Sequence, residues 1–322
     1  MSRDHMKNFN EYFMSTIVET VAQKIQVFNQ ASAGAIVLSS EGFVGDFLQT
    51  SFYRSLESGQ REVSTGGANS AVTAIDLSQQ QINTVKVMGA LGPIRYEPSQ
   101  MAWLEKPTQE GIAVVSNAFS DIYMKDMLNR GLLAAVAAIE NNTDAVHDVS
   151  ATAGLTYSAM NSAHAKFGDA SGSIVASIMN GATAHKLIGD NLANAERLYN
   201  FGGVTVIDIL GKAVIITDAP ALFEAGTPSK AKILGLVQGG LKIDQTGAVN
   251  TNIDTANGKE RLETTIQSEY TFAIGLDGYS WNIANGGHSP KSAKLGTGAN
   301  WDKVMASVKH SAGVLTIGDA NK

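Results

Sequence analysis

The stretch PTQEGIAVVSNAFSDIYMKDMLNRGLLAAVAAIEN, from Pro107 to Asn141, is predicted to form one helix that decides the fold. Pro107 fits the first helical position, where a missing N–H costs nothing, and Glu110 lies in the first turn. Apolar residues then recur at spacings of three and four along one stripe: Ile112, Val115, Phe119, Tyr123 and Met127. At 1.5 Å per residue the helix is ~50 Å long, whereas a compact chain of this length has a radius of gyration of ~20 Å. One helix therefore spans the molecule.

The stripe broadens in the second half of this helix. After Gly131 nearly every residue is apolar: Leu132, Leu133, Ala134, Ala135, Val136, Ala137, Ala138 and Ile139. A helix that is apolar on most sides is buried on most sides. Taken alone, the feature fits a core helix of an ordinary enzyme as well as it fits a structural subunit.

Composition indicates a globular chain with an unusually uncharged surface. Hydrophobic residues make up 44% and charged residues 17% of the 322 residues, whereas charged residues are about 25% of typical soluble domains. We expect part of this surface to be buried against partners. The net charge is −6, and acidic and basic residues balance from Phe201 onward, so the chain lacks the basic footprint of a dedicated nucleic-acid-binding protein.

Several classes of protein are excluded by what the sequence lacks. The chain contains no cysteine, which excludes thiol catalysis, thiolate metal sites and disulfides. It has no uncharged apolar run of 18 residues and no positive-then-apolar start, so we expect neither a membrane span nor a classical secretion signal.

The first hundred residues change character twice. Asn8 to Gln30 is predicted to be an amphipathic helix with Phe9, Phe13, Ile17, Val21, Ile25 and Phe28 on one stripe, and we expect this stripe to dock. A short helix with Phe47, Leu48, Phe52 and Leu56 is predicted to follow. The polar stretch from Arg61 to Gln100 is then predicted to hold a hairpin, Val85 to Tyr96, that turns at Ala90 to Pro93. Its side chains cannot form a core of their own.

The rest of the chain is predicted to mix helices and strands. Helices are expected at Ser158 to Phe167, Asn180 to Ala195 and from Asn300 to Val304. Strands are expected at Ser173 to Met179, Val204 to Ile207, Ala213 to Thr217 and Gly313 to Ile317, and a β-rich region is expected from Ala231 to Ile243 and from Leu262 to Ile283. We find no linker that divides two domains.

Catalytic motifs are absent from the sequence. No two of the six histidines are spaced three or four residues apart, so a zinc site is not expected. HExxH, GxxxxGK[ST], GxSxG and GxGxxG do not occur. His147 and Asp148 are adjacent and should face different ways, and Asp218 before Ala219 and Pro220 is best explained as a turn former. We expect no enzyme activity, no metal and no cofactor.

Two groups of residues remain open to more than one interpretation. Positive charge gathers near the end of the chain at Lys291, Lys294, Lys303, Lys309 and His310, which fits solvated loop charges or contact with phosphates. Trp103, Trp281 and Trp301 are expected to anchor a core or an interface, because large aromatic residues dominate both.

The pattern as a whole resembles the major capsid proteins of tailed bacteriophages. The resemblance rests on the long helix, on GGVTVIDILGKAVIITDAPAL (Gly202 to Leu222), on ILGLVQGGLKI (Ile233 to Ile243), and on YTFAIGLDGYSWNI (Tyr270 to Ile283). The nearest matches are the stretch from Lys166 to Tyr199 and GGHSPKSAKLGTGANWDKVMASVKHSAGVL, from Gly286 to Leu315. Together these cover nearly the whole chain.

The resemblance implies an α+β fold of the Hong Kong 97 type. Residues 1–58 would be an N-terminal arm, 59–100 an extended loop, and 101–142 the part of the peripheral domain that holds the spine helix. Residues 143–228 would form the axial domain, and 229–322 the strands and C-terminal return of the peripheral domain. Some relatives form Lys–Asn cross-links, but no such set of residues maps onto this sequence, and we do not predict one.

The implied function is assembly into hexamers and pentamers of an icosahedral head that encloses double-stranded DNA. Expected partners are other copies of the chain, a portal, a scaffolding protein, in some cases a decoration protein, and packaged DNA through weak non-specific contacts. The expected location is the virion, after assembly in the bacterial cytoplasm. Residues predicted to lie at subunit interfaces are Phe9, Phe13, Ile17, Val21, Leu91, Pro93, Tyr96, Trp103 and Trp301.

Two other classes stay open from sequence alone. An encapsulin-like compartment would share the fold and hold cargo enzymes instead of DNA, although the long N-terminal helix argues mildly against it. An enzyme of unrecognised type would place His147, Asp148 and Asp218 in one cleft.

Overall fold

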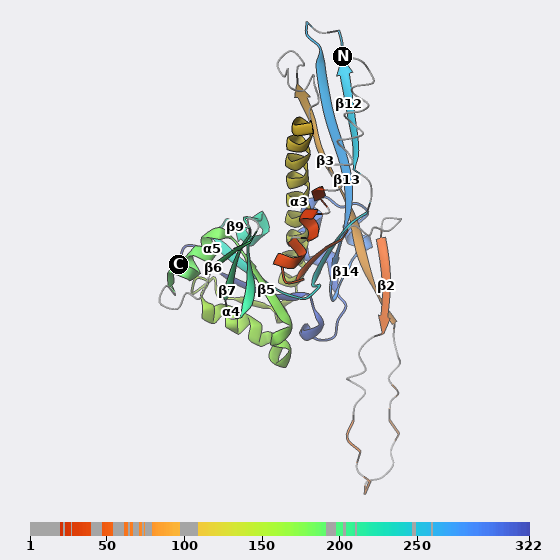
Figure 1. The fold of residues 1–322 in the computed structure, drawn as a ribbon. Helices are drawn as coiled ribbons and strands as arrows, with labels where there is room; N and C mark the ends of the chain where they lie inside the picture. Colours follow the sequence, from red (N-terminus) through yellow and green to blue (C-terminus); the bar gives the residue numbers. More distant parts are fainter. Residues whose placement is uncertain are drawn as a thin grey trace.

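The computed structural model describes residues 20–21, 23–26, 28–39, 47–53, 61–63, 65–66, 71–72, 74, 79–96, 109–190, 198–201, 204–209, 211–246, 249–258 and 260–322. Their centre is the long helix α3 (Gln109–Glu140), with a β-sheet on either side and two projections that leave in opposite directions (Figure 1). The predicted helix is therefore confirmed to within two residues at its start and one at its end. Pro107 lies outside the described residues.

Burial along α3 follows the predicted stripe. Phe119, Tyr123 and Met127 are buried, and from Leu132 to Ile139 all side chains but Leu133 are buried. Gly131 lets the helix approach a strand closely, because a Cβ atom there would lie 2.5 Å from Cδ1 of Ile243. The side chains of Ile112 and Val115 lie outside the described residues.

The first sheet carries both projections. Its strands are β1 (Ile36–Ser39), β2 (Phe47–Tyr53), β3 (Gln79–Tyr96), β11 (Leu241–Gln245), β12 (Asn250–Ala256), β13 (Glu263–Leu276), β14 (Tyr279–Trp281) and β15 (Trp301–Lys303). They follow the order β1-β11-β13-β14-β15, with β12 and β3 paired to β13 and β2 paired to β3. Only β1 and β11 run parallel among these pairs.

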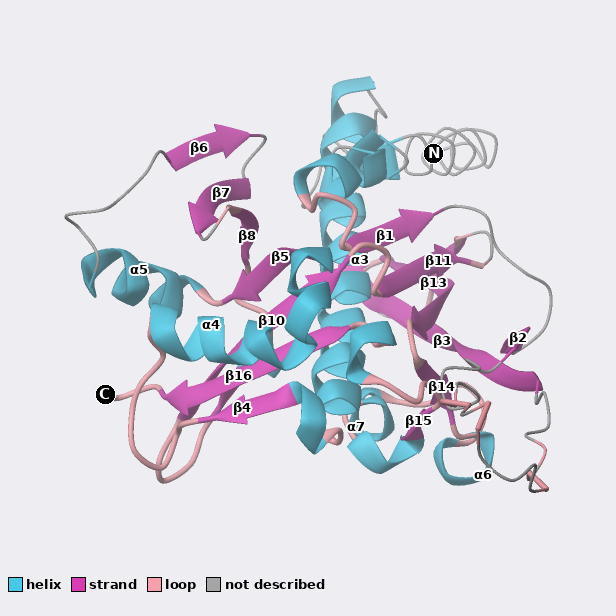
Figure 2. Ribbon diagram, turned by 90° about the horizontal axis from the view of Figure 1, so that it is seen from below, coloured by secondary structure: helices cyan, strands magenta, loops and turns pink. Residues whose placement is uncertain are grey.

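The second sheet is compact. Its strands are β4 (Val146–Asp148), β5 (Ile174–Met179), β6 (Leu198–Phe201), β7 (Val204–Ile209), β8 (Lys212–Ile216), β9 (Phe223–Glu224), β10 (Lys230–Val237) and β16 (Gly313–Asp319). They follow the order β4-β16-β10-β5-β8-β7-β6, with β9 beside β10 (Figure 2). Helices α4 (Tyr157–His164) and α5 (Gly181–Asp190) cover one face of this sheet.

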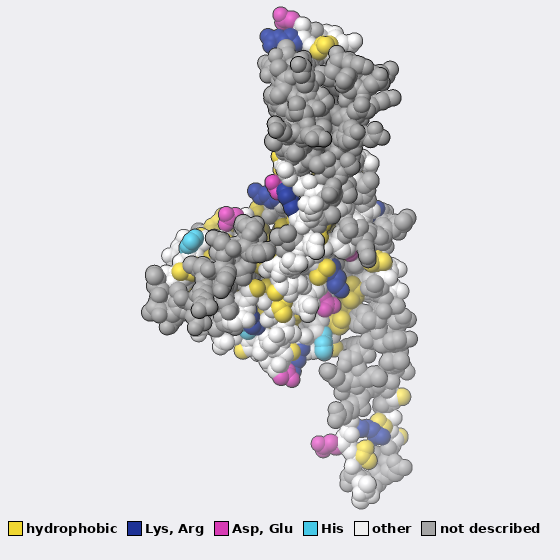
Figure 3. Space-filling model, in the orientation of Figure 1, with side chains coloured by type: hydrophobic (Ala, Val, Ile, Leu, Met, Phe, Trp, Pro, Cys, Tyr) yellow, Lys and Arg dark blue, Asp and Glu magenta, His cyan; other side chains and the backbone are white. Residues whose placement is uncertain are grey.

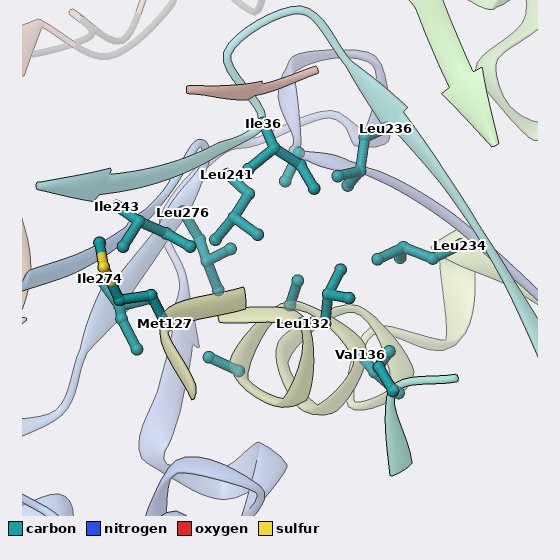
Figure 4. Close-up of a cluster of buried hydrophobic side chains, with 14 of the residues drawn as sticks. Ile36, Met127, Leu132, Val136, Leu234, Leu236, Leu241, Ile243, Ile274 and Leu276 are labelled. Carbon is teal, nitrogen blue, oxygen red and sulfur yellow. The ribbon is translucent and has the colours of Figure 1, made fainter. Parts of the chain in front are cut away.

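Both sheets pack against α3, and the main core lies at these contacts. Leu132 and Val136 of the helix join a cluster with Leu234 and Leu236 of β10 and with residues of β11 and β13 (Figure 4). Ile233, the neighbour of Leu234, belongs instead to the cluster under α4 and α5. Successive residues of a strand face opposite sides of a sheet, so β10 contributes to both faces. The layers are α4 and α5, the second sheet, α3 and the first sheet.

Short helices fill the remaining connections. Two α-helical turns, α6 (Ile283–Gly286) and α7 (Ser292–Leu295), precede β15. Turns of 3-10 helix are η3 (Thr143–Ala145), η4 (Ala165–Ser173), η6 (Pro220–Leu222), η7 (Gly298–Asn300) and η8 (Val308–His310). The predicted strands at 173–179, 204–207, 213–217 and 313–317 are confirmed as β5, β7, β8 and β16.

Three predicted elements are wrong. Residues 47–53 form strand β2 instead of a helix, because they pair with residues 79–85 of β3. Residues 85–96 form no hairpin: β3 continues through Gly92 and pairs with β13 on both sides of a register shift. The Gly-Pro signal therefore marks a bulge and not a reversal. The predicted helix at Asn300 is also wrong, because residues 301–303 pair with β14 as strand β15.

Candidate assembly surface

Two projections extend from the core along opposite directions (Figure 1). We call β2, residues 79–85 of β3 and the described residues between these strands the β2–β3 arm. We call residues 86–96 of β3 together with β12, β13 and the turn between them the ribbon. The arm is built by pairing of Phe47 with Val85 through Tyr53 with Gln79. The ribbon is built on β13, which pairs with β3 and with β12 along its outer half.

Exposed apolar side chains concentrate on these projections. Leu48, Val63 and Val72 belong to the arm, and Val63 is the most exposed of them at 70%. Met88, Ile94 and Leu262 belong to the ribbon. Elsewhere in the described residues, Ile122 and Phe223 are the large apolar side chains of comparable exposure. Figure 3 shows apolar atoms near the far ends of both projections. Apolar residues that gather in a contiguous patch on a folded subunit mark a contact site, so these residues are candidates for an assembly surface.

Polar side chains fix the root of the ribbon to α3. Tyr270 donates its hydroxyl to Oδ2 of Asp126 at 2.7 Å, and Nε of Arg130 donates to Oδ1 of Asp126 at 3.0 Å. Nη1 of Arg130 also donates to the carbonyl of Met88 at 2.8 Å. Burial, and next the bond to Asp126, raise the pKa of Tyr270, so this phenol keeps its proton. One network thus joins α3, β3 and β13.

Close packing adds to this joint. The rings of Tyr123 and Tyr270 lie 4.4 Å apart in an edge-to-face arrangement. Gly89 makes room for Tyr270, because a Cβ atom at this position would lie 2.2 Å from the ring. The ribbon is therefore held at a defined position along the spine of the subunit.

Beyond its root, the strands of the ribbon are joined by pairs of polar side chains. The hydroxyl groups of Thr251 and Ser268 form a hydrogen bond of 2.8 Å between β12 and β13, and those of Thr255 and Thr264 form another of 3.2 Å. Arg95 and Glu263 form an ion pair of 3.0 Å between β3 and β13. These cross-strand pairs explain how a ribbon with few apolar pairs keeps its register.

Two residues predicted to lie at subunit interfaces are buried inside the subunit. Val21 is 2% exposed and packs with Ile25 in the main core, and its helix is tied to α3 by an ion pair of 2.6 Å between Lys24 and Asp121. Trp301 is 1% exposed, and its Nε1 donates to the carbonyl of Leu295 at 3.0 Å. Because these side chains have almost no free surface, they anchor the core of the single chain, and an interface role for them stays a prediction that this burial does not support.

The other predicted interface residues have mixed outcomes. Pro93 is exposed, and Leu91 is half-buried against the core. The backbone of Tyr96 pairs with Thr264, while its side chain lies outside the described residues. Phe9, Phe13, Ile17 and Trp103 also lie outside the described residues. Their interface role stays a prediction.

The exposed apolar residues of the projections were not predicted from sequence. Val63 and Val72 are single apolar residues in a polar stretch, and such isolated residues usually need no explanation. Met88 alternates with the buried Val85 and Val87, so it faces away from α3. This alternation was a usable signal once residues 79–96 were understood as one strand.

The residues of the alternative catalytic site do not come together. His147 and Asp148 lie on β4, whereas Asp218 follows β8 and its Oδ1 accepts a hydrogen bond of 3.2 Å from the backbone N–H of Gly181. Three strands separate β4 from β8 in the second sheet, which is ~19 Å at the usual strand spacing. Among the described residues, no group of three or more His, Asp or Glu could hold a metal ion.

Most of the lysines considered for phosphate contact bind oxygen atoms of their own chain. Lys303 pairs with Asp144 at 3.1 Å and Lys309 with Asp169 at 2.5 Å. Nζ of Lys294 donates to the carbonyl of Asn285 at 3.3 Å. Lys291 is exposed. In the described part of the chain, no helix has the length and apolar character needed to cross a membrane.

Comparisons with known proteins agree with this architecture. Residues 5–315 match the family described as Gp13-like, Major capsid protein 13-like. A comparison with curated proteins gives no match.

Solved phage structures share the fold at low sequence identity. A chain of the cyanophage Pam1 capsid asymmetric unit is 11% identical with a TM-score of 0.51, covering 88% of both chains. A chain of Mycobacterium phage Cain is 11% identical with a TM-score of 0.52, covering 90% of this chain and 89% of that one. A chain of the head of Helicobacter pylori bacteriophage KHP40 is 9% identical with a TM-score of 0.50, covering 91% and 88%. These likenesses confirm the predicted α+β fold of the Hong Kong 97 type.

Proposed function

Because the chain belongs to the Gp13-like major capsid protein family, and is thus a shell protein of a phage head, we propose that copies of it join through the β2–β3 arm and the ribbon. The shell would consist of hexamers and pentamers in an icosahedral arrangement. It would enclose double-stranded DNA. An encapsulin-like compartment is not favoured by the family match or by the phage capsid structures that share the fold.

The observation that carries this proposal is the uncovered apolar surface of the two projections. Leu48, Val63 and Val72 on the arm and Met88, Ile94 and Leu262 on the ribbon gain burial only against another molecule. At about 25 cal/mol per Å² of apolar surface, many such contacts in a lattice add up even where each is weak. Because the family is one of major capsid proteins, the partner that we propose is another copy of the same chain.

We propose one change to the domain boundaries expected from sequence. The extended loop would span residues 47–85 instead of 59–100, since β2 pairs with the first part of β3 and residues 86–96 pair with β13. The N-terminal arm would then end before residue 47. The spine helix within 101–142, the axial domain within 143–228 and the return within 229–322 stay as proposed.

Further partners are proposed from the family alone. They are a portal, a scaffolding protein, in some cases a decoration protein, and packaged DNA. DNA contact would be weak and non-specific, because the net charge is −6 and Lys303 and Lys309 are already paired with carboxylates. The proposed location is the virion, after assembly in the cytoplasm of the bacterial host.

Purification of the chain after expression without other phage proteins, followed by negative-stain electron microscopy, tests the proposed assembly. We expect closed or partly closed shells and capsomer-sized rings. A folded chain that stays monomeric at high concentration, with or without a scaffolding protein, would contradict self-assembly. Infected cells could also be the source of the particles. Shells recovered from them that enclose a cargo enzyme and contain no nucleic acid would instead favour the encapsulin-like compartment.

A further inference from the structure

The outer edge of β1 is sealed by side chains from the preceding helix. β1 stands at the end of the first sheet and pairs with β11 through one edge only among the described residues. Nδ2 of Asn29 donates to the carbonyl of Leu38 at 2.7 Å, and the N–H of Leu38 donates to Oδ1 of Asn29 at 2.9 Å. One side-chain amide thus makes both hydrogen bonds that a neighbouring strand would make.

A second side chain covers the next backbone group along this edge. The hydroxyl of Ser32 donates to the carbonyl of Ile36 at 3.1 Å. The N–H of Leu241 donates to the carbonyl of Ala35, so the backbone groups of the odd-numbered residues in this segment face β11. Backbone groups alternate between the two edges of a strand, so the backbone N–H and carbonyl groups of Ile36 and Leu38 face the outward edge. Asn29 and Ser32 therefore bind three of the backbone groups on the outward edge.

The sequence of this segment explains why a seal is needed. From Ala31 to Ser40 there is no charged residue and no proline, and the strand itself reads IVLS. Uncharged β-branched segments with an open edge pair readily with identical segments of other copies. Natural strand edges usually carry a charge, a proline or a cover that prevents this pairing. Here the cover is the helical segment of residues 28–31 and the turn that follows it.

We infer that the outward edge of β1 is a strand-pairing surface for a second copy of the chain, and that Asn29 and Ser32 keep it closed. The partner is a second copy because a shell subunit meets its own kind at high local concentration and because identical strands pair in register. The cap is an autoinhibitory contact that limits association to the projecting surfaces. It does not depend on where those surfaces dock, so it can hold or fail independently of the proposed assembly.

The test uses Asn29→Ala with Gln30→Ala as a matched control. Gln30 is exposed on the same helical turn, so its variant loses an equal amide without touching β1. Hydrogen exchange of the full-length unassembled subunit, held at low concentration, is measured residue by residue. We expect the Leu38 amide to exchange about tenfold faster in Asn29→Ala and unchanged in Gln30→Ala.

Sedimentation velocity across a concentration series then measures association of the same samples. We expect Asn29→Ala to form species larger than the wild type at concentrations where Gln30→Ala does not, with an infrared signature of intermolecular β-structure. Association equal to the control, despite a faster-exchanging Leu38 amide, would overturn the inference. So would unchanged protection of Leu38.

Loss of the overall fold is monitored at the same time. The amide of Leu315 in β16 lies in the distant second sheet and reports global unfolding. If Asn29→Ala loses protection there, Ser32→Ala decides the outcome, because the Ser32 hydroxyl contacts only the carbonyls of Asn29 and Ile36 and its loss leaves both hydrogen bonds of Leu38 in place. That variant is expected to show the same association with a smaller change in exchange, and an absence of association in a folded Ser32→Ala sample would then overturn the inference.

Discussion

The second sheet covers its apolar and charged side chains within the subunit, whereas the two projections leave apolar side chains exposed. Every residue of β16, and every residue of β10 after Lys230, is buried, with helices on both faces of the sheet. Even the buried Lys232 has partners, Glu140 at 2.8 Å and Glu224 at 3.0 Å. Burial lowers the pKa of Lys232, but its bonds to these two carboxylates outweigh burial and raise it, so this lysine stays charged.

The projections, by contrast, contain strands whose apolar side chains have nothing to cover them within the subunit. Val63 and Val72 are more than half exposed, and Met88 and Ile94 nearly so. The difference suggests a division between stability and assembly. The second sheet and α3 hold the subunit together, whereas in the proposed assembly the arm and the ribbon supply the contacts to other subunits. Changes in the two regions should therefore give different phenotypes.

The largest expected effect comes from shortening the arm. Replacing residues 54–78 by a short Gly-Asn-Gly turn joins Tyr53 to Gln79, which are already paired. We expect a folded subunit with an unchanged melting temperature that forms no shells. Electron microscopy and thermal unfolding together measure this result, and shells of normal yield would contradict it.

Deletion of residues 85–96 is the matching control. Val85 and Val87 are fully buried, and the segment pairs with β13 along most of its length. Its removal should therefore abolish folding as well as assembly.

Charge substitution at the tip of the arm should give the next largest effect. In the double variant Val63→Asp and Val72→Asp, each carboxylate would lose its water in a subunit contact, and an unpaired buried charge costs more than the roughly 2–7 kcal/mol of an unpaired polar group. We expect shell yield to fall at least about tenfold with no change in melting temperature. Glu62→Gln, at an exposed neighbouring position, is the control. Normal yield from the double variant would show that the tip stays in solvent.

A pH effect should appear in the compact region and not in the projections. Burial, and then the charge of Lys212, lower the pKa of His164 to about 4, below the ordinary value of about 6.5. The unfolded chain therefore binds a proton where the folded chain does not. The stability that neutral His164 provides is complete above about pH 6.5 and is lost as the pH falls toward about 4, by up to ~3 kcal/mol.

Urea unfolding between pH 7 and pH 4 measures this loss. Because Asp148 and Glu224, whose pKa values are lowered by hydrogen bonds and nearby lysines despite burial, also lose stability on acidification, the informative quantity is the difference from His164→Asn. The variant should lose less stability than the wild type over this range. Parallel curves would assign the acid sensitivity to the carboxylates alone.

The smallest expected effect is at the joint between ribbon and α3. Tyr270→Phe removes the hydrogen bond to Asp126 and should cost about 1–2 kcal/mol of unfolding free energy. Tyr123→Phe is a matched control, because the buried Tyr123 hydroxyl has no hydrogen-bond partner among the described residues. Its loss should change stability by less than about 0.5 kcal/mol. Equal costs for both variants would show that ring packing, and not the Asp126 network, fixes the ribbon.

Elements with strong side-chain patterns could be predicted from sequence. The spacing from Phe119 to Met127 gave α3, and the apolar runs at 213–217 and 313–317 gave two strands of the second sheet. The strands of the arm could not be found in this way. Residues 79–83 read QQQIN, and they are a strand because β2 supplies backbone partners, which no local pattern encodes.

The assembly surface was predicted only in part for a related reason. A sequence identifies apolar residues, but it does not say which of them the subunit itself will cover. Val21 and Trp301 looked like contact residues and are buried inside, whereas Val63 and Met88 were overlooked and are exposed. Pro93, at the bulge of β3, is the predicted contact residue that is exposed in the described part of the chain.

Cryo-electron microscopy of assembled particles tests most directly whether assembly resides in the projections. We predict closed shells in which the β2–β3 arm of each subunit lies against a neighbour, with Val63 and Val72 covered, while the second sheet keeps the packing it has in the single chain. Shells in which the arms extend freely into solvent and the subunits meet through other surfaces would contradict this prediction.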